Sequence, residues 1–397
     1  MFLKYTFLDL GYAPPSNAYL SKKDLNHPEV FFPLKIKVCD QCWLVQTEDY
    51  TDANSLFTPD YAYFSSTSSS WLLHAKNFSK KIIKDLGLNG TSNVIEVASN
   101  DGYLLKNFLK ANIPCLGIEP TDSTAEAAEK LGVPVIRKFF GEALGRQLAS
   151  KGKQADLIIG NNVYAHVPDI NDFTKGLKAL LKPEGSITLE FPHLMCLIQQ
   201  TQFDTIYHEH FSYLSLHTVS SIFASSGLRI YNVEKISTHG GSLRIYGCHE
   251  NAKHKKNKTV DILIEEEITC QLQTLDTYLH FQLKVDKIKN KFISFLIEQK
   301  LSGKKVVAYG AAAKGNTLLN YAGIKPDLIS VVFDGSKSKQ GQFMPGSHIS
   351  IENPKSIKDL NPDCIVILPW NICKEIKDKI DSIFSKKKLM ISINKFK

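Results

Sequence analysis

The residues best equipped for chemistry lie in one short segment, Tyr207-His208-Glu209-His210. Two imidazoles, a carboxylate and a phenol supply a base, an orienting acid and a hydrogen-bond donor. Histidine has an unperturbed pKa of about 6.5, so it accepts a proton near neutral pH. Zinc sites of the H-E-x-x-H type place their histidines one helical turn apart, whereas His208 and His210 are two residues apart, which disfavours a metal here. The segment indicates acid–base catalysis, with a structural role as the alternative.

A second group of polar residues lies at 96–102, in a turn between a buried strand and a helix. Glu119-Pro120 ends the next strand, and Glu119 follows Glu96 by 23 residues. An acidic residue there accepts ribose hydroxyls. The turn lacks the G-x-G-x-x-G pattern that a pyrophosphate needs, and the helix start offers free N–H groups. This favours a ligand without phosphate, such as S-adenosylmethionine. The residues expected to hold it in the turn are Glu96, Ala98, Ser99, Asn100, Asp101 and Gly102.

Polar residues also follow the strand expected over residues 155–160. Asn161 and Asn162 stand where open α/β sheets bind ligands at the carboxyl ends of their strands. We expect both amides to line the cofactor site and His166, in the same loop, to face the substrate. A structural role is the alternative for His166, because an isolated histidine is more often structural.

Two glycine-containing turns complete the set. His239-Gly240-Gly241 lies between two strand-like pieces and is followed by Arg244, which is available for an anion; a plain hairpin is the alternative. The turn over residues 309–316 contains Lys314 but lacks the Gly-Lys-Ser/Thr order of a Walker A loop. Its small residues, lysine and helix start predict a pyrophosphate or substrate contact.

The elements that position these residues alternate between helix and strand. Continuous apolar runs, among them residues 94–98, 155–160 and 304–310, are separated by helical patterns, which is typical of a parallel sheet covered on both faces. We therefore predict an α/β protein with two Rossmann-like units. The expected organisation is an irregular N-terminal domain (1–75), a central domain (76–250), a helical linker (251–300) and a C-terminal Rossmann-like domain (301–397).

Composition narrows the class of protein. The 397 residues are 43% hydrophobic and 22% charged, which excludes disordered and fibrous proteins. The formal charge of +8 is scattered, so we expect no nucleic-acid partner but a mild attraction for an anionic small molecule. No apolar run approaches the roughly 20 residues of a membrane span. We expect a cytoplasmic protein, monomeric or homodimeric, with no membrane partner.

Together these motifs resemble the family of nucleotide-deoxysugar 3-C-methyltransferases, and the resemblance covers nearly the full length. The motifs that carry it, in chain order, are FLDLGYAPPSNAYL, CDQC, YAYFSSTSSS, EVASNDGYLL, GIEPT, NNVYAHVPD, QFDTIYHEHFSYLSL, HGGSLR and YGAAAKGNTLLNY. The resemblance implies a zinc-binding-like N-terminal domain, a central class I methyltransferase domain using S-adenosylmethionine, and a C-terminal domain that helps to hold a nucleotide-diphosphate sugar.

The resemblance also implies roles for individual residues. The family's acid–base segment falls on Tyr207, Glu209 and His210, and a further catalytic tyrosine is best placed at Tyr63, with Tyr61 as its rival. The remaining substrate contacts that we expect are Tyr61, Ser65, His166, His239, Gly240, Arg244, Lys314 and Asn316.

The zinc site of the family uses two Cys-x-x-Cys pairs, and one pair is present, Cys39 and Cys42. The first pair would precede the Leu-Gly-x-x-Pro segment, and Met1 stands ten residues before Gly11. Two cysteines are half of the four ligands that a closed structural zinc site needs. Either zinc is absent or the natural start lies upstream.

The implied reaction is methylation of carbon. A 4-keto group acidifies the proton at C3 of the sugar, His210 removes it with Glu209 as its orienting partner, and Tyr207 donates to the enolate oxygen. The enolate then attacks the methyl group in line. Two alternatives stay open: a nicotinamide-dependent sugar oxidoreductase, suggested by the two Rossmann-like units, and a non-catalytic sugar-nucleotide-binding protein.

Overall fold

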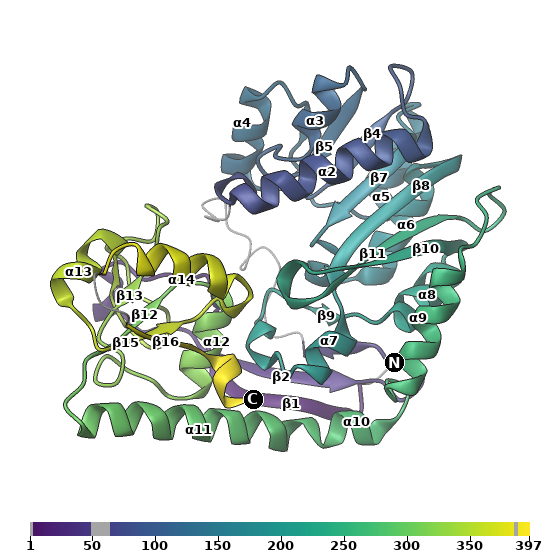
Figure 1. Ribbon diagram of the computed structural model, residues 1–397. Coiled ribbons are helices and arrows are strands. Elements are labelled where there is room, and N and C mark those ends of the chain that lie inside the picture. Colours follow the sequence, from purple (N-terminus) through teal and green to yellow (C-terminus); the bar gives the residue numbers. More distant parts are fainter. Residues whose placement is uncertain (1–2, 49–63, 385–387) are drawn as a thin grey trace.

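The computed structural model describes residues 3–48, 64–384 and 388–397, and within these ranges the chain forms three sheets (Figure 1). The central sheet has seven strands in the order β10-β11-β8-β7-β4-β5-β6. Its parallel strands β4 to β8 are joined by β11, which runs antiparallel to β8. The strand bounds are β4 Val94–Val97, β5 Cys115–Ile118, β6 Val135–Ile136, β7 Ala155–Asn161, β8 Leu181–Pro192, β10 Leu228–Ile236 and β11 Ser242–His249.

Helices cover both faces of this sheet, because its parallel strands are apolar on both sides. Apolar residues of α2, α3 and α4 pack on one face, and those of α5, α6, α8 and α9 pack on the other. This is the class I methyltransferase architecture, which confirms the predicted α/β fold class. The bounds are α2 Ser69–Leu86, α3 Leu105–Lys110, α4 Asp122–Lys130, α5 Glu142–Ser150, α6 Ile170–Leu180, α7 Leu194–Gln199, α8 Leu216–Ser225 and α9 Lys258–Thr269.

The C-terminal sheet is parallel throughout, with the strand order β14-β13-β12-β15-β16. Its four-residue strands β12 and β15 are wholly buried, with α11 and α12 on one face and α13 and α14 on the other. This is the second Rossmann-like unit. The bounds are β12 Val306–Tyr309, β13 Val332–Phe333, β14 Ile351–Glu352, β15 Cys364–Ile367, β16 Leu389–Ser392, α12 Ala313–Tyr321, α13 Ile357–Leu360 and α14 Cys373–Asp381.

The N-terminal region differs from the irregular structure that we expected. Strands β1 (Tyr5–Ala13), β2 (Phe32–Val38) and β3 (Val45–Thr47) form an antiparallel sheet, and β9 (Ser212–Tyr213) adds its last strand. Alternating buried residues in β2 form one apolar face of this sheet. Because β9 comes from the middle of the sequence, the N-terminal sheet is completed by the segment that follows the predicted catalytic residues.

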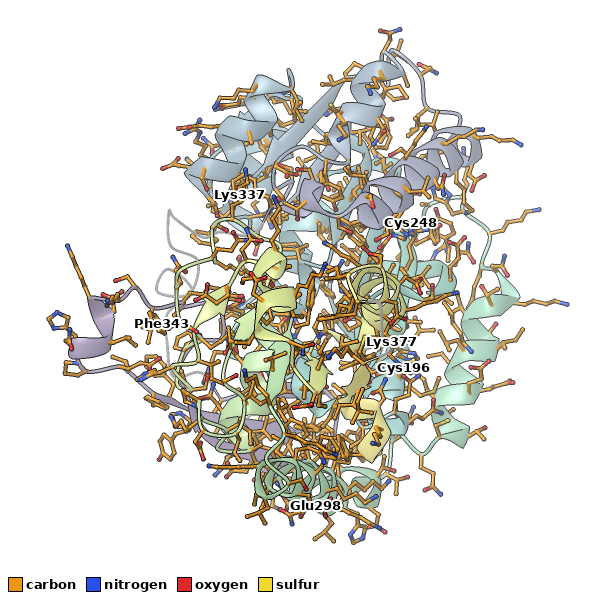
Figure 2. All side chains as sticks on the ribbon, turned by 60° about the vertical axis from the view of Figure 1, so that its left-hand side comes forward. Cys196, Cys248, Glu298, Lys337, Phe343 and Lys377 are labelled. Atoms are coloured by element: carbon orange, nitrogen blue, oxygen red, sulfur yellow. The ribbon has the colours of Figure 1, made fainter. Side chains whose placement is uncertain are left out.

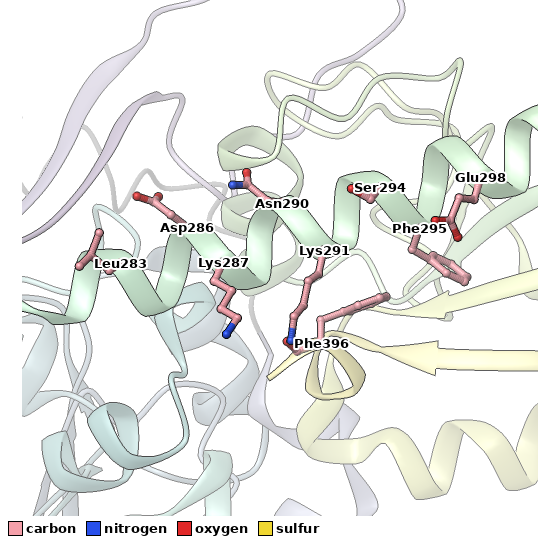
Figure 3. Close-up of a pocket in the computed structure, with 9 residues that line it drawn as sticks. All are labelled: Leu283, Asp286, Lys287, Asn290, Lys291, Ser294, Phe295, Glu298 and Phe396. Carbon is pink, nitrogen blue, oxygen red and sulfur yellow. The ribbon is translucent and has the colours of Figure 1, made fainter.

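The expected helical linker forms α9, α10 (Leu275–Leu279) and α11 (Phe281–Leu301). Helix α11 runs beneath both the N-terminal sheet and the C-terminal domain (Figure 1), and one continuous apolar core joins the three. An open hollow of about 750 Å³ lies along α11 (Figure 3), and none of the predicted site residues lines it.

Short 3-10 turns connect several of these elements, and three of them reappear at the site: Tyr164–His166, Phe203–Thr205 and Thr238–Gly240. The others are Asp24–Asn26, Ser65–Thr67, Pro354–Ser356, Trp370–Ile372 and Ile393–Phe396. The four expected domain ranges stay predictions. Among the described residues, no helix combines the length and apolar character needed to cross a membrane.

Helices α5 and α6 approach closely at two glycines. A Cβ at Gly145 would lie 2.5 Å from the carbonyl oxygen of Gly176. We expect Gly145→Ala to lower the free energy of unfolding by about 1–2 kcal/mol, because overpacking outweighs the better helix propensity of alanine. Urea unfolding measures this change. Gly90→Ala is the control, since its Cβ would meet only the Asn112 oxygen, at 3.6 Å. Equal stability of the two variants would contradict the prediction.

Candidate active site

The turn after β4 is built from unusual backbone conformations and held by one carboxylate. Ala98, Asn100 and Gly102 have φ angles of 56°, 49° and 74°, which side chains rarely adopt. Glu119, just after β5, accepts the N–H of Asn100 at 2.9 Å and that of Thr121 at 3.0 Å. Strain of this kind is tolerated where the surrounding structure over-determines it, as at functional sites.

Several buried polar atoms around this turn have no hydrogen-bond partner among the described residues. Both carboxylate oxygens of Glu96 and both amide atoms of Asn161 belong to this group. Buried polar groups are normally paired, so atoms of this kind indicate a ligand or water. The others near the turn and the end of β7 are Ser99 Oγ, Asp101 Oδ1 and Asn162 Oδ1.

The residues present fit S-adenosylmethionine. Carboxylate acceptors at Glu96 and Asp101 suit an amino group and hydroxyls, and Asn161 supplies both a donor and an acceptor. The described part of the turn offers no glycine-rich cradle for a pyrophosphate. Gly102 is required for packing as well, because a Cβ there would lie 3.1 Å from the Cβ of Ala128.

The 3-10 turn Ser65–Thr67, just before α2, contacts this turn. The N–H of Ser65 bonds to Oδ1 of Asn100 at 2.9 Å, and the N–H of Ser66 bonds to Oδ2 of Asp101 at 3.0 Å. Ser65 was expected to contact the substrate, and the structure places it against the cofactor turn. One helical turn further, Trp71 stacks on Tyr103 with ring centroids 6.1 Å apart.

The predicted catalytic segment is a buried turn in which His210 is held by the backbone. The His210 N–H bonds to the Tyr207 carbonyl at 2.9 Å, and Nδ1 lies 2.9 Å from the Thr205 carbonyl. A carbonyl only accepts, so Nδ1 carries the proton and Nε2 carries the lone pair. We expected Glu209 to orient His210. The structure assigns that role to Thr205, because neighbouring side chains in a turn point in different directions.

The rings around His210 form a compact cluster. The Tyr207 ring centroid lies 4.0 Å from that of His210, and the His166 centroid lies 4.6 Å away. Burial, reinforced by His166, holds the pKa of His210 well below its usual value. Burial likewise lowers the pKa of His166 and of His239 to about 4. All three imidazoles are therefore neutral at physiological pH.

His239 links this cluster to the cofactor side. Its Nε2 lies 3.2 Å from the Asn162 amide nitrogen, and both residues have left-handed backbones, with φ angles of 55° and 53°. The next residue, Gly240, has a reason to be glycine that we had not expected. A Cβ there would lie 2.3 Å from the Trp370 ring of the C-terminal domain. Close packing between domains explains Gly240, and its role as a substrate contact stays a prediction.

Arg244 lies in a buried ion-pair network. Its Nε donates to Glu190 at 2.7 Å, Nη1 lies 3.2 Å from Glu234, and His74 also contacts Glu190, at 2.9 Å. Two carboxylates already compensate the guanidinium charge. The structure thus differs from the expectation of an arginine available for an anion, because pairing offsets the cost of burying its charge.

The C-terminal turn contributes two predicted residues that lie in different surroundings. Lys314 lies over the Trp370 ring and donates to Asn371 at 2.8 Å. Burial lowers its pKa to about 8. Asn316 is fully buried and donates its amide N–H to the Ser16 carbonyl at 2.6 Å. The structure therefore gives Asn316 a partner in the N-terminal domain, where we had expected a substrate contact.

Two predicted groups remain, the tyrosines of the YAYFSS segment and the cysteine pair. Tyr61 and Tyr63 lie outside the described residues. Cys39 is buried, its sulfur accepts the Gln41 N–H at 3.4 Å, and no cluster of three or more metal-ligating side chains occurs in the described part of the chain. Two sulfurs do not fit a closed zinc site.

Sequence reasoning missed residues that hold the site from other domains. Asn17 donates to Glu209 at 2.6 Å, and the Trp370 indole donates to the buried Asp204 at 2.6 Å. Asn17 lies within the motif FLDLGYAPPSNAYL and Trp370 ends the run CIVILPW, but nothing local in either stretch indicates a contact with the catalytic segment.

Comparison with known families gives matches over three consecutive ranges. A "Putative zinc binding domain" matches residues 2–57, a "Methyltransferase domain" matches residues 63–233, and a "C-methyltransferase C-terminal domain" matches residues 237–393. Among curated proteins, the chain is 32% identical over 371 residues to C-methyltransferase NovU of Streptomyces niveus. The match covers 94% of this chain and 88% of that protein.

Several solved structures resemble part of the chain. Magnesium protoporphyrin IX methyltransferase from Synechocystis PCC 6803, solved with bound SAH, matches with a TM-score of 0.36 and 15% identity. The match covers 45% of this chain and 82% of that one. A methyltransferase of Thermotoga maritima matches with a TM-score of 0.36 and 16% identity, covering 47% of this chain and 96% of that one.

The unpaired Glu96 carboxylate generates a prediction about stability. Burial, followed by the charges of Glu119 and Asp101, raises the pKa of Glu96 well above 4.5. Only the folded state disfavours the ionised form. The free energy of unfolding therefore falls as the pH rises from the pKa of Glu96 in the unfolded chain to its higher pKa in the folded protein. Glu96→Gln removes the charge. We therefore expect it to raise the melting temperature of the ligand-free protein, relative to wild type, more at pH 8 than at pH 5.

Thermal unfolding at both pH values measures this difference. Glu250→Gln is the matched control, because Glu250 is exposed and the same exchange there leaves the pH dependence unchanged. If Glu96→Gln changes the melting temperature equally at pH 5 and pH 8, the surroundings of Glu96 do not disfavour its ionised form.

Proposed function

Because the chain belongs to the C-methyltransferase family and is an S-adenosylmethionine-dependent methyltransferase, we propose that it methylates C3 of a nucleotide-linked 4-keto-deoxysugar. The observation that carries this proposal is the state of His210: neutral, buried, and held at Nδ1 by a carbonyl so that Nε2 is the basic atom. A base of this kind suits removal of a proton from carbon. Family membership sets aside the nicotinamide-dependent and non-catalytic alternatives.

The cofactor site lies at the carboxyl ends of β4, β5 and β7. Glu96, the turn to Gly102, Glu119, Asn161 and Asn162 would hold S-adenosylmethionine, which supplies an electrophilic methyl group when bound. The carboxylates and amides there have the unpaired atoms described above. The Asn162–His239 contact connects this edge of the sheet with the imidazole cluster.

Proton removal is the step that this chain's own residues perform. The 4-keto group acidifies the C3–H bond, its proton moves to Nε2 of His210, and the electron pair of the bond becomes the enolate. A fixed ring orientation keeps Nε2 directed at one position. Holding the base and the C3 proton in this geometry supplies much of the rate acceleration. The proton leaves His210 for solvent after methylation.

Tyr207 stabilises the negative charge that forms. Its ring lies 4.0 Å from that of His210, so its hydroxyl belongs to the same small region as the base. A phenol that donates to the developing enolate oxygen lowers the barrier most in surroundings of low polarity. His166, whose ring also lies against that of His210, is neutral and contributes no competing positive charge.

The low pKa of His210 has a chemical consequence. A ring whose pKa is lowered by burial favours the free base near neutral pH. It is also a weaker base than an exposed histidine, so the reaction depends on the acidity that the keto group gives the C3 proton. A simple deoxysugar without the carbonyl would not react.

The nucleotide of the substrate lies toward the C-terminal domain in this proposal. Lys314 supplies a positive charge at the start of α12, beside the imidazole cluster, and its charge contributes to the lowered pKa of His239. A diphosphate bound there would place the attached sugar near His210. The zinc site that the family resemblance implies plays no part in these steps.

The first test is binding followed by turnover. Calorimetric titration with S-adenosylhomocysteine should show micromolar affinity, and NAD should not bind. Methyl transfer is then assayed with 4-keto sugars linked to thymidine, guanosine or cytidine diphosphate. Failure to methylate any of them, by a protein that binds S-adenosylhomocysteine, would overturn the sugar substrate.

We expect His210→Asn to lower kcat by about 10²–10⁴-fold, because it removes the base while its amide replaces the Nδ1–H donor toward Thr205. S-adenosylhomocysteine affinity should be nearly unchanged. The exposed His27 provides the control His27→Asn, which should keep full activity. A loss of cofactor affinity of roughly tenfold in the His210 variant would argue for a structural role instead.

A further inference from the structure

A short N-terminal segment, Ser16–Leu20, runs between the catalytic turn and the C-terminal domain. The buried Asn316 amide donates to the Ser16 carbonyl at 2.6 Å. The Tyr19 hydroxyl donates to the Ala311 carbonyl at 2.6 Å. These two bonds hold the segment against α12 and the turn that precedes it.

The far end of the same segment is also fixed. Leu20 and Phe343 exchange both backbone hydrogen bonds, at 3.0 and 2.8 Å, on the loop that Figure 2 labels at Phe343. The cation of Lys339 lies over the Tyr19 ring, 5.0 Å from its centroid. The C-terminal domain therefore holds Ser16–Leu20 along its whole length and leaves it little freedom to move.

Asn17, in the middle of this segment, reaches the catalytic turn. Its Nδ2 lies 2.6 Å from Oε2 of Glu209, whose exposed fraction is 2%. A carboxylate only accepts hydrogen bonds, so the amide nitrogen is the atom that faces it. Hydrogen bonds to an ionised acceptor are about twice as strong as those between neutral groups.

We propose that Asn17 is a positioning residue for Glu209, supplied to the methyltransferase site by the N-terminal domain; this rests on the proposed function. Thr205 orients His210, and Asn17 is the residue of the N-terminal domain that donates to Glu209. Tyr19 and Lys339 lie close enough to the Glu209 carboxylate to interact with its charge.

The geometry gives Asn17 a role that a packing residue would not have. A donor at 2.6 Å fixes the position of one oxygen of Glu209. Since the C-terminal domain fixes Asn17 in turn, the domain proposed to hold the nucleotide also sets the position of a carboxylate in the acid–base segment. The site is incomplete without all three parts of the chain.

Asn17→Asp tests the proposal, because it keeps the shape of the side chain and exchanges the donor for an acceptor. We expect kcat to fall about 100-fold, with the KM for the sugar nearly unchanged, since a small displacement of a catalytic group has an effect of this size. The assay uses thymidine-diphosphate-linked 4-keto-6-deoxyglucose and methyl-labelled S-adenosylmethionine. Wild-type kcat, or an effect on KM alone, would overturn the proposal.

Asn26→Asp is the matched control. It makes the same exchange at an exposed position of the same N-terminal region, so it should keep wild-type kcat. Asn17→Ala distinguishes the two possible causes of a lower kcat in Asn17→Asp, which are the lost hydrogen-bond donor and the added negative charge. It removes the Asn17 donor from Glu209 but adds no charge, so its kcat should lie between those of wild type and Asn17→Asp. An alanine variant with wild-type kcat would count against positioning.

A second measurement needs no substrate. In Asn17→Asp two carboxylates face each other, so the melting temperature should fall by about 3 °C, and the same change should have no effect in a Glu209→Gln background. Equal effects in both backgrounds would show that the two side chains do not interact. If the wild-type protein methylates no 4-keto sugar, the proposed function and the catalytic part of this proposal are both overturned. If Asn17→Asp changes the melting temperature equally in both backgrounds, only the contact between Asn17 and Glu209 is overturned.

Discussion

Residues 203–213 are buried where the three sheets meet, and a polar segment in such a place needs hydrogen-bond partners, because an unpaired buried group costs about 1–3 kcal/mol. The partners come from elsewhere in the chain. Trp370 donates to Asp204, Thr317 donates to the Ile206 carbonyl at 2.8 Å, and His208 lies 3.2 Å from the Pro33 carbonyl. The conformation of the catalytic turn therefore depends on the N-terminal and C-terminal domains as much as on its own residues.

The same burial determines the chemistry. Low polarity keeps the imidazoles of His166, His210 and His239 neutral, which preserves a lone pair on the base. It also raises the pKa of Glu96 in the cofactor site, so the ligand-free protein loses stability there. Both effects follow from excluding water, and in the proposed function both become useful when ligands occupy the site.

Much of the fold follows from local patterns. The apolar runs at 94–97, 115–118, 155–161 and 306–309 form buried parallel strands, and helices lie between them as the alternating pattern predicts. Local patterns did not reveal the N-terminal sheet, in which β3 is short, bulges interrupt the pairing of β1 with β2, and β9 comes from residues 212–213. No local pattern marks two residues as the edge of a sheet whose other strands lie more than 160 positions earlier.

The sequence by itself determined the kinds of groups present, their order and the family to which they belong. Tyr207, Glu209 and His210 are adjacent in the chain, so their clustering needed no structure to be seen. Tertiary structure decided that Thr205 holds Nδ1 of His210, that Glu190 and Glu234 compensate Arg244, and that Gly240 makes room for Trp370. Only tertiary structure brought Asn17 to Glu209. The physical reason is that hydrogen bonds and close packing form between atoms that folding brings together, and the order of residues records none of those distances.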